Sequence, residues 1–397
     1  MTLKTKVLFV GAGPSQMPAI KHANSLGYES YAIDADPNAV GFEFAIEKDV
    51  GDIRDLDFIK VCAQRYGVNA VVAVATDVAV PSVARACQLL GLPSIPVKAA
   101  DISVNKVMQR DCLKAAGIRV PKYMPFHNVN EAQKCVDDIG LPVVIKPSDS
   151  AGSRGVSLVQ VGFDIIRAAE DALTASRSGT GIIEEYVDGT EVSVEGFVVD
   201  RIFYDICISE KTRTSPPYLL DTEVHFPDSL LSAERVSVLD LARSAVAACG
   251  LDNCPVHMEI LRSSQGPVLV ELAARGAGFR VFTNILPHVT GVDTVDMQLR
   301  LALGEKVKIV AQEPLKGAVI TFLSPISGKL KSHEGVDLAR DLPGIQEAEV
   351  YIEPGTVMGD LKCGADRIGH IIAFGETRQE AEIRTKQALA LIKLKLE

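Results

Sequence analysis

Two glutamates in the stretch HMEILRSSQGPVLVELAAR, residues 257–275, stand where like charges would repel each other. The short alternating runs HMEIL and VLVEL flank the turn-forming residues SSQGP, which is the pattern of a β-hairpin. Alternation places Glu259 and Glu271 on one face of that hairpin, together with His257 and Ala273. If the glutamates pair across the strands, their Cβ atoms lie about 4.5–5.5 Å apart, and like charges so placed destabilise a sheet.

A divalent cation would explain this carboxylate pair. The apolar residues of the hairpin are expected to share the other, buried face: Met258, Ile260, Val268, Val270 and Leu272. Two adjacent carboxylates can share a proton, lie screened in solvent, or hold a metal ion. Arg275 nearby and an expected anion site favour the third, because Mg²⁺ is typically bound by one or two carboxylates together with substrate phosphates.

Two lysines and a glycine-rich loop indicate that anion site. Lys146 lies inside the apolar strand VVIKP, where an unpaired ammonium is costly to bury. In the following DSAGSRGV, Gly152 and Gly155 let backbone N–H groups approach phosphates, and Arg154 adds charge; a flexible hairpin loop is the alternative. The loop joins two expected strands and lacks G-x-x-x-x-G-K-[ST], which excludes an ordinary P-loop. Lys106, in a short helix, joins this set.

The segment IIEEYVDGTEVSVE is dense in carboxylates at the end of an apolar strand. Glu184, Glu185, Glu191 and Glu195 could all be charges solvated at a sheet edge. The segment decides nothing by itself.

Composition describes an ordinary globular protein of two or three domains, with 397 residues, 47% hydrophobic and 23% charged. The net charge of −10 argues against nucleic acid or an anionic membrane as the main partner. Eight cysteines without a C-x-x-C pair indicate reduced thiols in a cytoplasmic protein. The N-terminal apolar run VLFV predicts a core strand and no secretion signal, and no run of 18 apolar residues predicts a membrane span.

The elements that would position these residues fall into three regions. The first hundred residues alternate Val/Ala/Ile-rich strands with helices, which predicts a parallel sheet covered on both faces. Their GAGPS turn is an incomplete dinucleotide fingerprint, with Gln16 in place of the third glycine and Asp34 near the ribose-binding distance; a tight strand-to-helix turn explains it equally well. The sequence pattern changes at about residues 93–100, where this first region ends. Residues 209–230 are expected to form a loop, residues 232–250 a helix, and the tail from about 306 strands and one terminal helix.

Taken in order, these motifs resemble the ATP-grasp superfamily, and within it the carboxylate–amine ligases of the amino-acid ligase and carbamoyl-phosphate-synthetase-like branches. The motifs are Lys106, VVIKP with Lys146, the glycine loop 149–156, EEYV at 184–187, Glu191, HME with Glu259, and ELAAR with Glu271 and Arg275. The resemblance implies an α/β chain (α+β in the ATP-binding part) with a parallel-sheet pre-ATP-grasp domain at 1–98. An ATP-grasp domain at 99–305 would follow, with a small lid subdomain at about 120–187. A C-terminal domain at 306–397 would complete the ATP-grasp unit.

The resemblance also assigns roles to single residues. Those implied to bind ATP are Lys106, Lys146, Gly152, Ser153, Arg154, Gly155, Glu184, Tyr186, Val187 and Glu191. Glu259 and Glu271 would hold Mg²⁺, with Mn²⁺ as an alternative, and Arg275 and Lys146 would offset charge during catalysis. Residues placed beside the substrate are Glu223, His225, Arg280 and Asn284, and the Gly11–Ser15 turn could add substrate contacts. The family usually has Asn two residues after the second glutamate, where Ala273 stands here, so the second metal would have fewer protein ligands.

The implied reaction is ATP-dependent, ADP-forming ligation of a small carboxylate, an amino acid, to an amine through an acyl phosphate. A carboxylase-type relative that phosphorylates bicarbonate is one alternative, although no biotin-carrier lysine motif is present. Another is a non-catalytic ATP-binding sensor, for which Ala273 argues. A nicotinamide oxidoreductase based on GAGPS would leave both lysines and both glutamates unexplained. Homodimers are common in the family, and no residue of the sequence indicates one.

Overall fold

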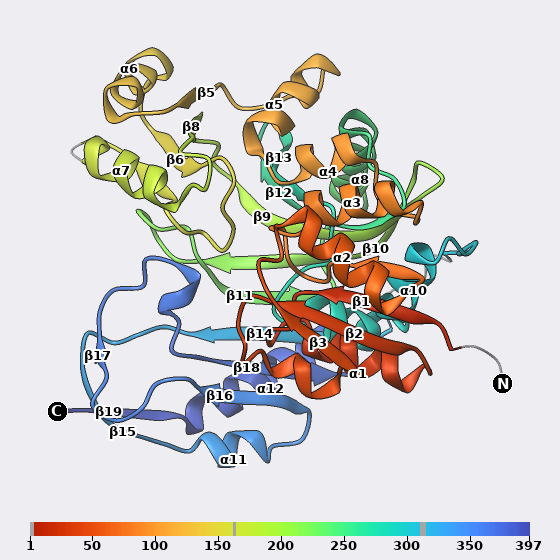
Figure 1. The fold of residues 1–397 in the computed structure, drawn as a ribbon. Helices are drawn as coiled ribbons and strands as arrows, with labels where there is room; N and C mark the ends of the chain where they lie inside the picture. Colours follow the sequence, from red (N-terminus) through yellow and green to blue (C-terminus); the bar gives the residue numbers. More distant parts are fainter. Residues whose placement is uncertain (1–3, 162–163, 310–314) are drawn as a thin grey trace.

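The computed structural model describes residues 4–161, 164–309 and 315–397. Its N-terminal part is a four-stranded parallel sheet in the order β3-β2-β1-β4, as the alternating pattern predicts (Figure 1). The strands are β1 Lys6–Val10, β2 Glu29–Asp34, β3 Glu47–Val50 and β4 Ala70–Val72. The side chains of β1 alternate between two cores, one shared with α1 (Met17–Ser25) and the other with α2 (Leu56–Tyr66) and α3 (Val80–Leu90). Both faces are therefore covered, which parallel strands require.

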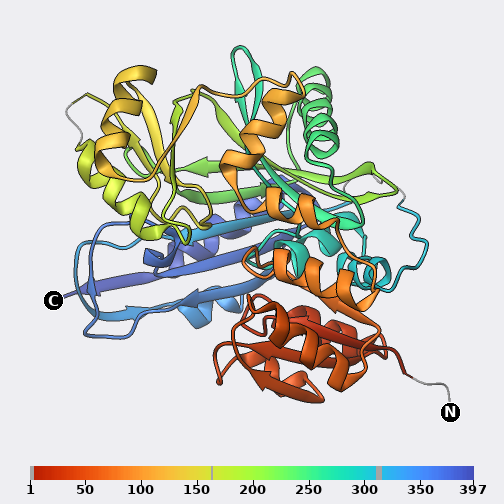
Figure 2. The ribbon, with the colours of Figure 1, turned by 45° about the horizontal axis from the view of Figure 1, so that its top comes forward.

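A large antiparallel sheet of eight strands, in the order β13-β12-β9-β10-β11-β14-β18-β16, forms the centre of the molecule (Figure 2). Five of its strands come from the middle of the chain: β9 Thr190–Val199, β10 Ile202–Arg213, β11 Asp221–Phe226, β12 Cys254–Ser263 and β13 Gly266–Ala273. Three come from the tail: β14 Gly317–Leu323, β16 Ile345–Val350 and β18 Gly369–Gly375. The tail strands thus extend the sheet that carries Glu259 and Glu271.

A small antiparallel sheet with its own apolar core lies beside the large one, in the order β5-β8-β6-β7. Its strands are β5 Tyr123–Phe126, β6 Val143–Pro147, β7 Ser157–Val159 and β8 Gly181–Glu185, and its helices are α6 Val129–Ile139 and α7 Ile165–Ala175. The glycine-rich loop connects β6 to β7, as expected from the sequence.

The remaining elements connect and cover these sheets. The helices are α4 Val97–Ser103, α5 Lys106–Ala115, α8 Ser232–Cys249, α9 Leu286–Thr290, α10 Thr294–Ala302, α11 Val336–Arg340 and α12 Arg378–Leu391. Short turns are η1 Val40–Phe44, η2 Val281–Ile285 and η3 Gly364–Asp366, and a peripheral three-stranded sheet contains β15 Gly328–Glu334, β17 Val357–Met358 and β19 Lys393–Leu396. Among the described residues, no helix is long and apolar enough to cross a membrane.

The predicted loop at residues 209–230 is wrong over much of its length, because β10 and β11 occupy it. The segment has few structural signals in its sequence, which suggested a loop. In the structure Lys211 and Arg213 pair with Glu191 of β9 and Glu210 pairs with Arg378 of α12, so the segment can be a strand despite its charge. The expected terminal helix is present as α12, and a further short strand, β19, follows it.

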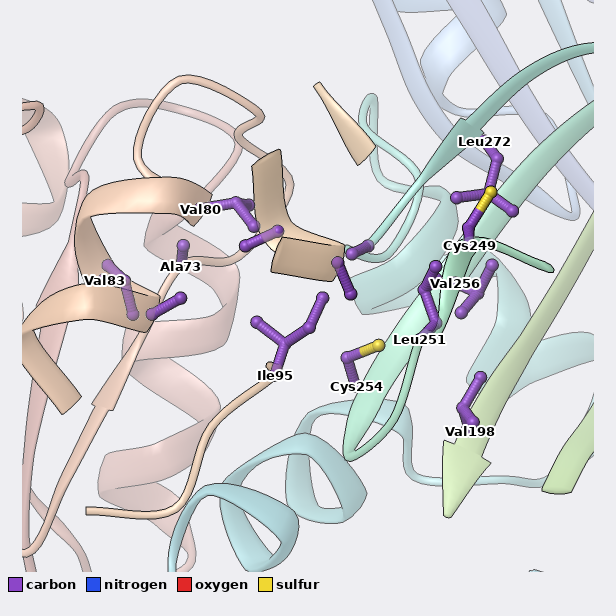
Figure 3. Close-up of a cluster of buried hydrophobic side chains, with 14 of the residues drawn as sticks. Ala73, Val80, Val83, Ile95, Val198, Cys249, Leu251, Cys254, Val256 and Leu272 are labelled. Atoms are coloured by element: carbon purple, nitrogen blue, oxygen red, sulfur yellow. The ribbon is translucent and has the colours of Figure 1, made fainter. Parts of the chain in front are cut away.

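A continuous apolar core joins the N-terminal region to the large sheet. Figure 3 shows Ala73, Val80 and Ile95 of the N-terminal region facing the same cluster as Cys254 and Val256 of β12. These side chains are buried, and packing of this kind resists displacement of one part against the other. The loop after β4 is therefore held in place against the end of β13, where the functional side chains lie.

Candidate active site

Glu259 and Glu271 face each other directly across the β12–β13 hairpin, and both line a cavity of about 230 Å³. The turn between Ser263 and Gly266 closes the hairpin, as its sequence predicts. One expectation is wrong: Val270 does not share the fully buried face. The register shifts after Glu259, so that Val270 is the extra residue of a β-bulge and lines the cavity instead.

Two lysines offset the repulsion between these glutamates. Lys211 of β10 lies 2.5 Å from a carboxylate oxygen of Glu259, and Lys106 of α5 lies 3.0 Å from one of Glu271. Burial would raise the pKa of Glu259, but Lys211 and His257 outweigh it and hold that pKa well below its usual range. Each carboxylate thus has a cationic partner, which offsets the repulsion between the two glutamates.

Lys211 is one candidate site residue that the sequence reasoning missed. Its ammonium also contacts Glu191 at 2.8 Å and Asp221 at 3.3 Å, and Arg213 holds the other oxygen of Glu191 at 2.9 Å. Attraction to these carboxylates outweighs burial and raises the pKa of Lys211 well above its usual value. No local signal marked it, because the surrounding run SEKTRT, residues 209–214, is polar throughout and lacks the apolar–polar alternation of a strand.

A second buried ion cluster lies at the small-sheet side of the cavity. Lys146 of β6 and Arg110 of α5 both lie 2.8 Å from Glu184 of β8. Burial lowers the pKa of Lys146, while Arg110 and Lys146 overcome the burial of Glu184 and lower its pKa to about 2. The anion that the sequence required beside Lys146 is therefore supplied by the protein. All three side chains line the cavity.

Acid should remove the contribution of Glu184 to stability. Its pKa is about 2 in the folded protein against an ordinary 4.5, so the stabilisation is complete above pH 4.5 and is lost as the pH falls towards 2. We expect this group to lower the free energy of unfolding by about 3 kcal/mol across that window. Urea unfolding at several pH values between 7 and 3 measures how steeply the free energy of unfolding falls with pH. The variant Glu184→Gln, less stable at pH 7, should lose stability less steeply on acidification; equal slopes would contradict the assignment.

The glycine-rich loop borders the cavity through part of its length. Gly152 and Ser153 line the cavity, and both have left-handed backbones, with φ of 70° and 56°. Gly155 lies outside, and a Cβ there would stand 2.8 Å from the Asp171 carbonyl oxygen, so helix α7 requires glycine at this position. Arg154 is exposed and lines a neighbouring cavity of about 180 Å³. Of the loop residues implied to bind ATP, Arg154 and Gly155 thus lie outside the lining of the main cavity.

Aromatic and aliphatic side chains also line the cavity. Tyr186 and Val187, which follow β8, line it together with Leu261 of β12. Such a mixture of aromatic and aliphatic side chains suits a planar ring, and ligand cavities commonly combine apolar walls with a few polar groups. Glu191, implied to bind ATP, both lines the cavity and belongs to the Lys211 cluster.

Arg275 is oriented by the N-terminal region. Asp77, in the loop after β4, accepts two hydrogen bonds from its guanidinium at 2.8 and 2.9 Å. Close by, His257 Nδ1 lies 2.5 Å from Glu195, which is only 2% exposed and is no surface charge. Burial would lower the pKa of His257, but Glu195 raises it to about 9. Asp77 and Glu195 thus fix two cationic side chains at the wall of the cavity.

Glu223 and His225, proposed for the substrate, do not reach the cavity. The register of β10 and β11 shifts between Thr212 and Arg213, which turns Glu223 and His225 to the other face of the sheet. There His225 contacts Glu382 of α12 at 3.1 Å. The prediction for these two residues is wrong because a bulge reverses which side chains share a face.

Arg280 and Asn284 also lie outside the cavity lining. Arg280 donates to Glu347 of β16 at 3.0 Å and to the Pro14 carbonyl at 2.6 Å, while Asn284 is exposed. In the GAGPS turn, Ala12 N donates a hydrogen bond to Asp34 at 2.7 Å, which holds the turn against the end of β2.

Comparison with known proteins agrees with the fold and the cavity. Residues 139–283 match the ATP-grasp domain, and residues 321–397 match the L-amino acid ligase C-terminal domain 2. An L-amino acid ligase from Bacillus licheniformis superposes with a TM-score of 0.86 and 18% identity over the whole of both chains. The chain therefore has the ATP-grasp fold, and the resemblance to the ATP-grasp superfamily is confirmed.

Two relatives indicate the range of proteins with similar sequences. The alanine–anticapsin ligase of Bacillus subtilis (strain 168) is 29% identical over 262 residues, which is 60% of this chain and 54% of that ligase. A formate-dependent phosphoribosylglycinamide formyltransferase of Haloquadratum walsbyi is 28% identical over 411 residues, which is 98% of this chain and 94% of that enzyme. The chain spans only 54–65% of the length of several curated relatives, the first of these two among them.

Proposed function

We propose that this chain is an ATP-dependent, ADP-forming ligase that joins a small-molecule carboxylate, an amino acid, to an amine through an acyl phosphate. The observation that carries the proposal is the facing pair Glu259 and Glu271, which share one cavity with Lys106 and Lys146. Lys211 lies outside the cavity lining and pairs with Glu259. Two acidic ligands beside several cations suit a metal–polyphosphate complex better than either ion alone.

The residues fit ATP and its metal ion. Glu259 and Glu271 would hold Mg²⁺ or Mn²⁺, and Lys106, Lys146 and the backbone at Gly152 and Ser153 would hold phosphates. Tyr186 and Val187 would flank the adenine, and Glu191 would accept from the ribose hydroxyls. Glu184 serves by fixing Lys146. When bound, the metal ion offsets phosphate charge and makes the γ-phosphorus more electrophilic.

The side chains of this protein would overcome the repulsion between two anions. A carboxylate that approaches a phosphoryl group needs fixed positive charge on both sides, and Arg275, preoriented by Asp77, lies on the N-terminal side. His257, held by Glu195, adds a further charge on the same wall. Acyl phosphates hydrolyse readily, so the glycine-rich loop between β6 and β7 would act as a lid that excludes water.

Relatives support an amino acid as the carboxylate. The tail matches the L-amino acid ligase C-terminal domain 2, and one relative is an alanine–anticapsin ligase.

We also propose domain limits at residues 98 and 305, with a lid subdomain at about residues 120–187. Eight free cysteines suit a reducing, cytoplasmic environment.

A carboxylase-type function is the second candidate. It is favoured by similarity along nearly the whole chain to carboxylating enzymes, among them an N5-carboxyaminoimidazole ribonucleotide synthetase from Thermotoga maritima (TM-score 0.73, 19% identity, 99% of this chain). In that case bicarbonate would replace the carboxylate as the group that is phosphorylated.

ADP release separates these functions. The assay uses ATP, Mg²⁺ and a panel of amino acids, offered singly and in pairs, with bicarbonate as a separate arm. We expect release that depends on an amino acid together with an amine. Release that depends on bicarbonate alone would replace our proposal with the carboxylase reading. ATP binding without release under any condition would make the protein a sensor.

A further inference from the structure

Gln16, which follows the GAGPS turn, has no role in the function proposed above. It stands where a dinucleotide fingerprint has its third glycine, and it is the N-cap residue of α1. Its side chain makes no capping hydrogen bond, and glutamine is not among the residues that helices prefer at this position. The residue is only 8% exposed. A buried polar side chain that does not cap its own helix indicates a hydrogen-bond partner elsewhere.

That partner is the loop after β4. Gln16 Nε2 donates to the Val74 carbonyl at 2.8 Å and to the Ala75 carbonyl at 3.4 Å. These carbonyls lie beyond the end of β4, so they depend on donors outside the sheet. Gln298 of α10 supplies another hydrogen bond of the same kind, from Nε2 to the Ala73 carbonyl at 3.0 Å. Two side-chain amides from distant parts of the chain thus hold three consecutive carbonyls.

This loop needs support because its backbone is strained. Ala75 has a left-handed backbone, with φ of 49°, which is unfavourable for a residue with a Cβ atom. Two residues further along, Asp77 accepts hydrogen bonds from Nε and Nη2 of Arg275 at 2.8 and 2.9 Å. A strained segment keeps one conformation only where its surroundings fix it. The position of Asp77, and with it that of Arg275, therefore depends on the amides that hold the preceding carbonyls.

The turn that carries Gln16 is itself fixed and is shaped around this side chain. Gly11 N donates to the Ile33 carbonyl of β2 at 2.8 Å. A Cβ at Gly13 would stand 3.3 Å from Gln16 Oε1, and one at Gly11 would stand 3.4 Å from Gln16 Cγ. The two glycines thus leave room for a protein side chain, whereas a dinucleotide fingerprint uses its glycines to admit a pyrophosphate.

The same turn holds the far end of the segment that begins with Arg275. Arg280 Nη1 donates to the Pro14 carbonyl at 2.6 Å. The segment is therefore connected to the turn at both ends, through Asp77 and Gln16 at one and through Pro14 at the other. Fixed orientation of this kind is what stabilisation of a developing charge requires.

We propose that Gln16 is a positioning residue: its amide fixes the loop of Asp77, and through that loop it holds the Arg275 guanidinium in the orientation that phosphoryl transfer requires. This inference rests on the proposed ligase function and adds a residue of the N-terminal region that acts through two others. Gln16 does not line the main cavity, so it acts on the rate of the chemical step and not on nucleotide binding.

The kinetics of ADP release test the proposal. Gln16→Met keeps the length of the side chain but has no donor, and it should lower kcat by about 10- to 100-fold. KM for ATP should stay within about twofold of the wild-type value, because the residues that line the cavity are untouched. Gln16→Glu, which lacks the amide donors, should behave alike. Gln88→Met is the matched control, since Gln88 is an exposed glutamine on α3, and it should leave both constants unchanged.

A double variant shows whether Gln16 acts through Asp77. In the Asp77→Ala background the loop has no carboxylate to position, so Gln16→Met should lower kcat by less than about threefold. The full loss in that background, full kcat in the single variant, or a rise in KM for ATP that matches the fall in kcat would overturn the proposal. If Gln16→Met does not fold, Gln298→Met frees the neighbouring Ala73 carbonyl, and full kcat there would be equally contrary.

Hydrogen exchange separates this proposal from the ligase function. It is measured without substrates on peptides that cover residues 70–80. The amides of this loop should exchange about 10-fold faster in Gln16→Met than in the wild type or in Gln88→Met. If no amine supports ADP release while this difference persists, the ligase function fails and the hold of Gln16 on the loop stands. If the three proteins exchange equally, that hold fails, whatever the rate of ADP release.

Discussion

Replacing Glu271 by alanine should lower the rate of ADP formation by about 10²–10³-fold while leaving the fold intact. Glu271 faces Glu259 across the hairpin and is partly accessible from the cavity, so its loss removes a metal ligand without opening the core. Lys106 would keep its hydrogen bond to the Ser150 carbonyl, which limits the structural effect. Turnover is followed by ADP release, and the fold by circular dichroism and thermal unfolding.

Glu349→Ala is a suitable control for this variant, because Glu349 is an exposed glutamate on β16, outside the cavity lining. It should retain full activity. A higher Mg²⁺ concentration should recover part of the activity of Glu271→Ala, since Glu259 alone binds the ion more weakly than the pair does. Undiminished activity of Glu271→Ala at low Mg²⁺ would remove the metal assignment.

The variant Lys211→Met should cost about 3–5 kcal/mol in the free energy of unfolding. Lys211 is the cation shared by Glu191, Asp221 and Glu259, and without it these buried carboxylates repel each other. Urea unfolding at pH 7 measures the loss. Mg²⁺ alone should stabilise the variant more than the wild type, because the ion would replace the missing charge.

A surface lysine provides the comparison. Lys60 pairs with Asp57 at 2.6 Å on an exposed helix, and Lys60→Met should change stability by less than about 1 kcal/mol. If Lys211→Met costs no more than this, the carboxylate cluster is solvated and Lys211 does not organise the site.

The sequence predicted most of the elements that hold the site. The parallel N-terminal sheet, the hairpin with Glu259 opposite Glu271, and a glycine loop between two strands follow from apolar periodicity and turn chemistry, and all three are confirmed. These signals are local, so a single sequence contains them.

Ion pairs and bulges were beyond such reasoning. A buried Lys211 is stable only because Glu191, Asp221 and Glu259 come from other strands, and no local pattern reveals partners so distant in sequence. Likewise, Glu223 was proposed from the resemblance alone, and the bulge in β10 and β11 that turns it away from the cavity has no local sequence signal. Sequence reasoning therefore located the facing glutamates better than the residues that surround them.

The shared eight-stranded sheet has a consequence for dividing this protein. A chain that ended near residue 305 would lack β14, and β11 would become an edge with unpaired backbone N–H and C=O groups. Open edges of this kind template aggregation. The C-terminal quarter thus completes the sheet that carries Glu259 and Glu271, and the two parts should be produced as one piece.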